Sequence, residues 1–291
     1  MKKNTLLPVI AVAGGIAAFV LRLLQNRTGF EAATGLPVPG NIPGLVLVAC
    51  FAVLAAALLL LVRGLPKDAE NGSVFPTDFA TGNTTLLFLP VAGILLIALS
   101  GLADLFEGLT MGNLLSQMQA AADPYGMVAE ESYVGFSSRA QLILGALSLL
   151  SAVALLPVAI SCREKESENS KAFSGTLLLV PPVALVVRLV LTYRLDSVNP
   201  ALEAYYVELL ALVFLTLAFY RLSSFAFKAG RTPRFALYAG LAVVFSLATL
   251  ADGGPHLSSL LLYAGGAVTV LGFLVLRLSS TDTMRPTFPQ S

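Results

Sequence analysis

Five ionisable residues inside or beside apolar stretches are the ones whose side chains could do chemistry: Arg22, Asp104, Arg188, Glu208 and Asp252. A charge in the hydrocarbon of a bilayer costs at least about 2.5–3.5 kcal/mol on insertion scales, so such residues normally face a partner or a water-filled cavity. Carboxylates beside guanidinium groups suit an amphoteric or anionic solute, or proton transfer. We interpret these residues as a candidate ligand-binding or proton-handling site, which would also include Tyr205, Tyr206 and Asn199.

The spacing of Arg188 and Glu208 predicts an ion pair. Counted back from Arg194 at 1.5 Å per helical residue, Arg188 lies about 9 Å below the outer end of its segment. Counted forward from Pro200, Glu208 lies about 12 Å below the same surface. A short turn joins the two segments, so they should be antiparallel neighbours with these two side chains at matching depths.

Asp104 and Asp252 each follow a Leu-Ala pair at the expected C-terminal end of a helix. The helix dipole opposes a carboxylate there, so each aspartate needs water or a cationic partner. Arg22 and Arg188 are the expected partners. The alternative is that these charges form interhelical salt bridges that only fix the packing.

Motifs for other chemistry are missing from the sequence. The chain has one histidine, His256, and no Walker-type glycine loop, G-x-S-x-G motif or Asp-rich metal motif, so we predict no catalytic residue, metal site or cofactor. Cys50 and Cys162 fall at different depths and are expected to be unpaired. The basic residues near Lys228 are too sparse for a nucleic-acid surface, and membrane topology explains them.

The elements that must position these residues are membrane spans. Of the 291 residues 56% are hydrophobic and 12% charged, with a mean hydropathy of +0.82. A soluble domain is about one quarter charged, so the composition excludes that class. An all-α integral membrane protein with eight transmembrane helices is predicted, because eight segments approach the roughly 20 apolar residues of a span. They are Leu6–Leu24, Gly44–Val62, Thr85–Phe106, Ala140–Ile160, Gly175–Leu191, Ala201–Leu222, Pro233–Leu250 and Leu257–Leu278. Pro181 and Pro182 should kink the fifth.

Most of the 18 lysines and arginines fall in loops on the side of the N-terminus. The positive-inside rule therefore predicts a multi-pass protein of the cell membrane with both termini cytoplasmic. The recurrence of Arg22 and Arg188 near the ends of the first and fifth spans, and of Asp104 and Asp252 at the ends of the third and seventh, suggests an internal duplication. Because four spans return the chain to its starting side, the two four-helix halves would be parallel.

The predicted halves cover residues 1–165 and 171–291, with no soluble domain. The first half carries an extracytoplasmic insertion at about 107–137. Within it an apolar stripe predicts a short helix that lies on the outer interface, caps a mouth between the halves, or packs on its own bundle. The stripe consists of Met111, Leu114, Leu115 and Met118.

Two functions from different classes fit this sequence. The leading hypothesis is a small-solute binding protein or secondary transporter that uses the outer charged residues. The alternative is a non-catalytic membrane subunit or sensor that acts through a membrane protein partner, with the charges serving only helix packing. An enzyme acting on lipid comes third, because the sequence shows carboxylates but no nucleophile or metal site. In each case the chain contacts the lipid bilayer and no nucleic acid.

Overall fold

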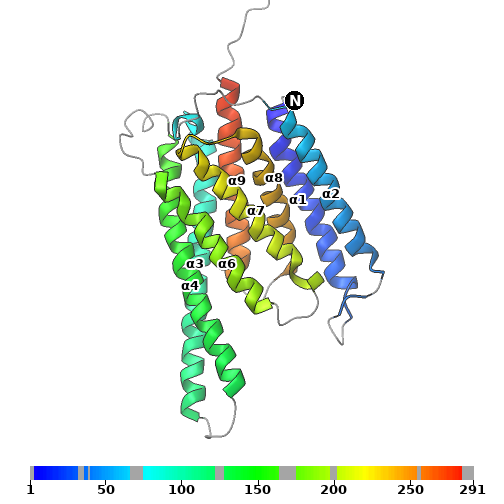
Figure 1. The fold of residues 1–291 in the computed structure, drawn as a ribbon, viewed down its shortest axis with the longest axis vertical. Coiled ribbons are helices and arrows are strands. Elements are labelled where there is room, and N and C mark those ends of the chain that lie inside the picture. Colours follow the sequence, from blue (N-terminus) through cyan, green and yellow to red (C-terminus); the bar gives the residue numbers. More distant parts are fainter. Residues whose placement is uncertain are drawn as a thin grey trace, which may run out of the picture.

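The computed structural model describes residues 3–31, 36–38, 40–65, 75–121, 128–163, 175–196, 202–253 and 257–283. This part of the chain is a bundle of long helices (Figure 1), of which eight are long and apolar enough to cross a membrane. The prediction of an all-helical protein with eight candidate spans is confirmed. The helices are α1 (Lys3–Thr28), α2 (Ile42–Arg63), α3 (Thr84–Ala121), α4 (Val128–Ser161), α6 (Val180–Asp196), α7 (Leu202–Ala226), α8 (Thr232–Thr249) and α9 (Leu257–Thr283).

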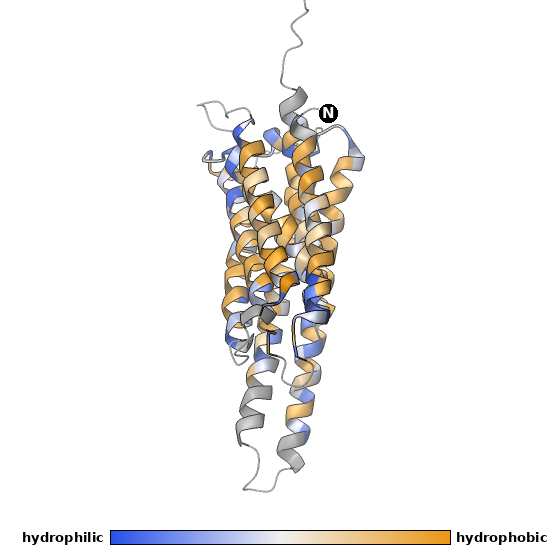
Figure 2. Cartoon of the chain, turned by 90° about the vertical axis from the view of Figure 1, so that its right-hand side faces the viewer, coloured by the Kyte–Doolittle hydropathy of each residue, from blue (hydrophilic) through white to orange (hydrophobic). Residues whose placement is uncertain are grey.

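Helices α8 and α9 form the centre of the bundle. Their most apolar windows are 72% and 61% buried, compared with 22% for α2 at the periphery. Outward-facing side chains such as Leu45, Phe88 and Val153 are between 69% and 75% exposed, as expected for residues that face lipid. Figure 2 shows the resulting apolar band, which spans the bundle between more polar ends.

Close helix contacts in the centre depend on glycines. A Cβ atom added to Gly93 of α3 would lie 2.4 Å from the backbone nitrogen of Thr269 on α9, and one added to Gly265 would lie 2.8 Å from the carbonyl oxygen of Gly93. Small residues at such crossings let two backbones approach closely in a membrane, where apolar surface alone does not drive association. This contact between α3 and α9 is one of the most extensive in the bundle.

The prediction of a separate short helix in the insertion is wrong. Helix α3 continues to Ala121 and α4 begins at Val128, so the insertion extends two spans into one long hairpin that projects beyond the bundle (Figure 1). The stripe near Met111 therefore belongs to α3 itself. No proline or other strong helix breaker follows Asp104 within α3, and Gly108 and Gly112 pack against α4, so the helix has no reason to stop at the membrane surface.

The fifth span begins differently from the kinked helix that its prolines predicted. A short 3-10 helix, Gly175–Leu179, precedes α6, and Pro181 and Pro182 stand in the first turn of α6. The first-turn positions have no intrahelical acceptor for their N–H groups, so proline is tolerated there. The two prolines therefore mark the start of a helix and do not bend one.

The end of the bundle that holds the start of α1 and the end of α9 is closed by a contact that we call the inner clamp, after the side of the membrane on which the positive-inside rule predicts it to lie. Arg277 of α9 is buried, and it donates hydrogen bonds to the hydroxyl of Thr232 (2.9 Å) and to the carbonyl oxygen of Asp78 (3.1 Å). The Asp78 carboxylate lies 3.5 Å from the guanidinium. Asp78 belongs to a 3-10 turn, Thr77–Phe79, whose Phe79 ring packs edge-on against Phe225.

Candidate functional site

The guanidinium of Arg188 on α6 forms a two-pronged ion pair with Asp104 on α3. Its two terminal nitrogens lie 2.8 and 3.4 Å from the two carboxylate oxygens, and NH1 also lies 3.4 Å from the hydroxyl of Ser148 on α4. The Asp104 side chain is fully buried and that of Arg188 is 5% exposed. Such a buried pair is stable only when its geometry satisfies both charges, and here the fork of the guanidinium matches the carboxylate.

Arg22 on α1 forms a second ion pair, with Asp252 in the 3-10 turn Leu250–Asp252 that ends α8. The Nε–Oδ1 distance is 2.5 Å. The same carboxylate oxygen accepts a hydrogen bond from Asn26 at 3.0 Å, and NH1 of Arg22 donates to Gln25 at 2.8 Å. The ring of Tyr206 lies 5.5 Å from the Arg22 guanidinium. The Asp252 side chain is 19% exposed, so this pair is less enclosed than the first.

We call these two ion pairs the outer clamps, after the side of the membrane on which the positive-inside rule predicts them to lie. They confirm that Arg22 and Arg188 are the partners of the two aspartates. The argument from the helix dipole holds for Asp252, which ends its helix, but it is wrong for Asp104, because α3 continues to Ala121. Asp104 therefore pairs with Arg188 because both are buried together.

The predicted pair between Arg188 and Glu208 is not the one that forms. Arg188 bonds to Asp104 and Ser148, whereas Glu208 accepts a hydrogen bond of 2.7 Å from the hydroxyl of Tyr263 on α9. Tyr263 is almost completely buried, so its hydroxyl needs a partner inside the bundle. Helix α6 thus presents Arg188 to α3 and α4.

One of the remaining predicted site residues contacts an ion pair. Tyr206 contacts Arg22, and Tyr205 is half-buried at the start of α7. Asn199 lies outside the residues that the structure describes. Within the predicted site the structure thus shows three polar contacts: the Arg22 clamp, the Arg188 clamp and the Glu208–Tyr263 pair.

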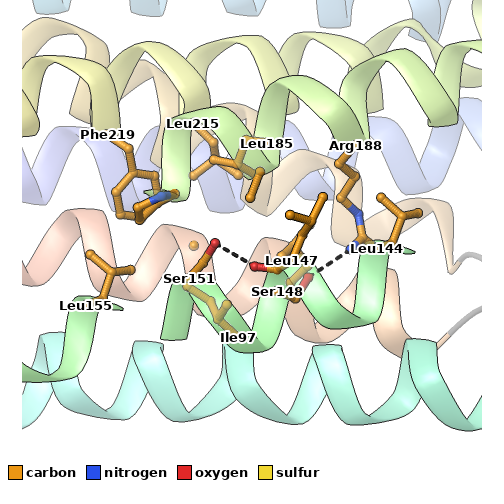
Figure 3. Close-up of a pocket in the computed structure, with 14 residues that line it drawn as sticks. Ile97, Leu144, Leu147, Ser148, Ser151, Leu155, Leu185, Arg188, Leu215 and Phe219 are labelled. Carbon is orange, nitrogen blue, oxygen red and sulfur yellow. Dashed lines mark hydrogen bonds between the residues drawn. The ribbon is translucent and has the colours of Figure 1, made fainter. Parts of the chain in front are cut away.

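A small cavity of about 20 Å³ lies beside Arg188. Its lining comes from α3, α4, α6, α7 and α9, and Figure 3 shows Ser148 and Ser151 on one side and Phe219 on another. A cavity needs about 10–15 Å³ to hold a water molecule, so this space fits roughly one. The Ser151 hydroxyl donates to the carbonyl oxygen of Leu147, so the cavity is mostly apolar away from Arg188.

Three polar residues that complete the clamps were missed at the sequence level: Gln25, Asn26 and Ser148. Gln25 and Asn26 follow Arg22 by about one helical turn, so they share a face with it, and this spacing was a usable signal. Ser148 had none, because serine is common in membrane helices and only the fold brings it to Arg188.

Cys50 and Cys162 are both free thiols. Cys162 is fully buried at the end of the α4 span, and burial raises the pKa of its thiol well above the ordinary range. The neutral thiol is a poor nucleophile, so Cys162 should be inert toward polar thiol reagents. Among the described residues, no group of three or more His, Cys, Asp and Glu side chains is placed to hold a metal ion.

Comparison of the chain with protein-family models, with curated proteins and with solved structures gives no match.

Proposed function

We propose that this chain is a small-solute binding protein of the cell membrane that works as a secondary transporter. The observation that supports this proposal is the pairing of the outer clamps across the two predicted halves. Arg22 of the first half pairs with Asp252 of the second, and Arg188 of the second pairs with Asp104 of the first. A two-fold axis along the membrane normal would exchange the halves and carry one clamp onto the other, which supports two parallel repeats, 1–165 and 171–291.

Contacts between halves are the ones that must break when one half rocks against the other. The outer clamps join the halves at one end of the bundle, and the inner clamp joins Asp78 of the first half to Arg277 of the second at the other end. With both termini in the cytoplasm, the outer clamps face outside. The bundle would then be closed at both ends, and each transport step would open one end.

The cavity beside Arg188 is the proposed solute position. It lies between α3 and α4 of the first half and α6, α7 and α9 of the second, so separating the halves would enlarge it. Breaking the ion pair between Arg188 and Asp104 would also expose both charged groups to the cavity. These charges would suit an amphoteric or anionic solute, and proton coupling through the carboxylate.

The experiment measures whether the cavity opens when a clamp is broken. A single cysteine replaces Ser151 in a chain whose Cys50 and Cys162 are alanine. We expect Asp104→Asn with Arg188→Gln to speed its labelling from outside by a small charged thiol reagent roughly tenfold, and Arg277→Gln to speed labelling from inside instead. A thermal-stability screen against a solute library, with flux of any hit in proteoliposomes, then identifies the substrate.

A non-catalytic subunit or sensor acting through a membrane partner is the second candidate. It is favoured by the burial of the clamps: Arg22, Asp104 and Arg188 are each at most 5% exposed and each has a bonded partner. In that case the charges fix the packing only. The cysteine at position 151 would then stay protected in every clamp variant, and no solute would stabilise the protein.

A further inference from the structure

The corner where α7 ends and α8 begins carries charge of one sign. It lies at the end of the bundle that holds the inner clamp, because Thr232 at the start of α8 belongs to that clamp. Between Glu208 and Asp252 the sequence contains four cations and no carboxylate. These cations are Arg221, Lys228, Arg231 and Arg234. All but Arg221 are exposed. Membrane topology predicts cations at this end, but it does not predict how they are arranged around the corner.

Arg221 has no acceptor for its guanidinium in the part of the chain that the structure describes. The guanidinium lies against two aromatic rings, 5.5 Å from the centre of Tyr220 and 5.7 Å from that of Tyr238 on α8. Its Nε atom is buried and unbonded among the described residues. The ring faces attract the cation but do not replace the hydrogen bonds of its five N–H groups. An acceptor for Arg221 must therefore come from outside the protein.

Tyr238 connects Arg221 with a second arginine. Arg234 precedes Tyr238 by four residues on α8, so the two side chains share one face of that helix. The Arg221 guanidinium lies against the ring of Tyr238, so both arginines border the same surface. Arg234 lies two residues after the start of α8, nearer the end of the bundle than Tyr238. The surface thus carries one guanidinium group inside the span and another at its edge.

The depth of Arg221 indicates that a lipid supplies the acceptor. The α7 span ends at Ala226, which places Arg221 about 7.5 Å inside it. An arginine side chain is long enough to carry its charge from that depth toward the boundary, where the phosphates of lipids lie. Tyr220 and Phe227 are 51% and 55% exposed beside it, as is typical of aromatic residues at this boundary. A soluble protein or a nucleic acid would not reach Arg221.

The uniform charge indicates which lipid binds. A zwitterionic headgroup brings an ammonium group together with its phosphate, and the corner has no carboxylate to pair with that ammonium. An anionic headgroup avoids this repulsion, and clusters of basic residues beside a span attract such lipids. We propose that the α7–α8 corner binds an anionic phospholipid, whose phosphate accepts hydrogen bonds from Arg221 and Arg234. This site does not depend on whether the chain transports solutes.

Quenching of an introduced tryptophan measures which lipid occupies the corner, because the chain contains no tryptophan of its own. Tyr220→Trp keeps an aromatic ring beside Arg221, and Leu156→Trp is the control, an exposed position at a similar distance from the end of α4. Each protein is reconstituted in phosphatidylcholine with a minority of phosphatidylglycerol brominated on its acyl chains. One basic residue near a membrane surface corresponds to about a fivefold preference for an anionic lipid. We expect a preference of about tenfold or more at position 220 and of about twofold or less at position 156.

Neutral variants of the two arginines test their roles. In the Tyr220→Trp protein, Arg221→Gln should lower the preference about fivefold, and Arg234→Gln in addition should remove the rest. Arg221→Gln should leave the melting temperature in detergent unchanged, because no described residue bonds to this guanidinium. Arg163→Gln is the matched control, since it removes an exposed cation just after α4 at the same end of the bundle. It should leave the preference at position 220 unchanged.

Four results would overturn the proposal. Equal preference at positions 220 and 156 would show that anionic lipid collects at this end of the bundle without a site. A preference that Arg221→Gln leaves unchanged, or that Arg163→Gln lowers equally, would show that the corner does not bind the headgroup. A lower melting temperature for Arg221→Gln would show that the protein itself uses the guanidinium. Relief of the excess quenching by millimolar inorganic phosphate would assign the arginines to a soluble anion.

Discussion

At the scale of single residues, the two outer clamps differ in how completely protein replaces water around the charges. Asp104 is fully buried and has both oxygens bonded to Arg188. Asp252 is partly exposed, and Asn26 shares its Oδ1 atom with Arg22. Removing one member of a buried pair leaves the other charge without compensation, and that penalty shrinks where water can reach the charge.

We therefore predict that Asp104→Asn lowers the free energy of unfolding by about 3 kcal/mol and that Asp252→Asn lowers it by less. The double variant Asp104→Asn with Arg188→Gln should recover part of the loss, because no lone charge is left buried. Thermal unfolding in detergent measures the stability of the unchanged protein, of Asp104→Asn and Arg188→Gln alone, and of the double variant. Additive losses in the double variant would contradict a direct pair.

The inner clamp leads to a different residue-scale prediction. The main acceptors of Arg277 are the hydroxyl of Thr232 and the backbone carbonyl of Asp78, whereas the Asp78 carboxylate is 3.5 Å away and 15% exposed. Arg277→Gln should therefore destabilise the protein by about 2 kcal/mol or more, and Asp78→Asn by well under 1 kcal/mol. The same unfolding assay compares the two. A larger loss for Asp78→Asn would show that the carboxylate, not the backbone, holds Arg277.

At the scale of helices, the contact between α3 and α9 depends on Gly93. Its substitution by alanine would bring Cβ within 2.4 Å of the α9 backbone, so one helix must move. We expect Gly93→Ala to cost about 1–3 kcal/mol, as overpacked cores do. Gly112→Ala on the same helix is the control, because its Cβ would meet only Ser138 Oγ at 3.3 Å and the change favours helix. Equal melting temperatures for the two variants would contradict the close crossing.

The long hairpin makes a second prediction at this scale. From Asp104 to Ala121 α3 rises by about 25 Å, which carries it out of the bilayer. Phe106 and Asn113 are both exposed on α3, but lipid should cover Phe106 and water should reach Asn113. With Cys50 and Cys162 replaced, a membrane-impermeant thiol reagent added to intact cells should label Asn113→Cys and not Phe106→Cys. Labelling of both cysteines, or of Phe106→Cys alone, would show that the membrane boundary does not lie between Phe106 and Asn113.

The helices show which features a sequence can predict. Apolar length predicted the eight spans because the bilayer, not the protein, sets that length. The same rule ended the third helix near Phe106. That end is wrong for the helix, because α3 continues to Ala121 and packs Gly108 and Gly112 against α4. Charge predicted that Arg22 and Arg188 are the partners of the two aspartates, because few charged side chains lie within the apolar segments. The hydrogen bond from Tyr263 to Glu208 was beyond prediction, because only the fold brings these two side chains together.

At the scale of the whole molecule, two extensive helix contacts join the two predicted halves. Helix α3 packs along α9, and α1 packs along α8. Helices α8 and α9 are also the most buried spans, so the second half alone would expose surface that the first half covers. We therefore expect that neither half forms a stable bundle by itself.

This arrangement predicts fragment complementation. Residues 1–165 and 171–291, expressed separately, should each be degraded, whereas expressed together they should co-purify as a complex. Arg22→Gln with Arg188→Gln should lower the yield of that complex several-fold, because both outer clamps cross between the fragments and each substitution leaves an aspartate without its arginine. Arg139→Gln, which changes an exposed arginine on α4, is the matched control and should leave the yield unchanged. Stable fragments in isolation, or a complex that is indifferent to both clamp substitutions, would show that the halves fold without each other and that the clamps do not hold them together.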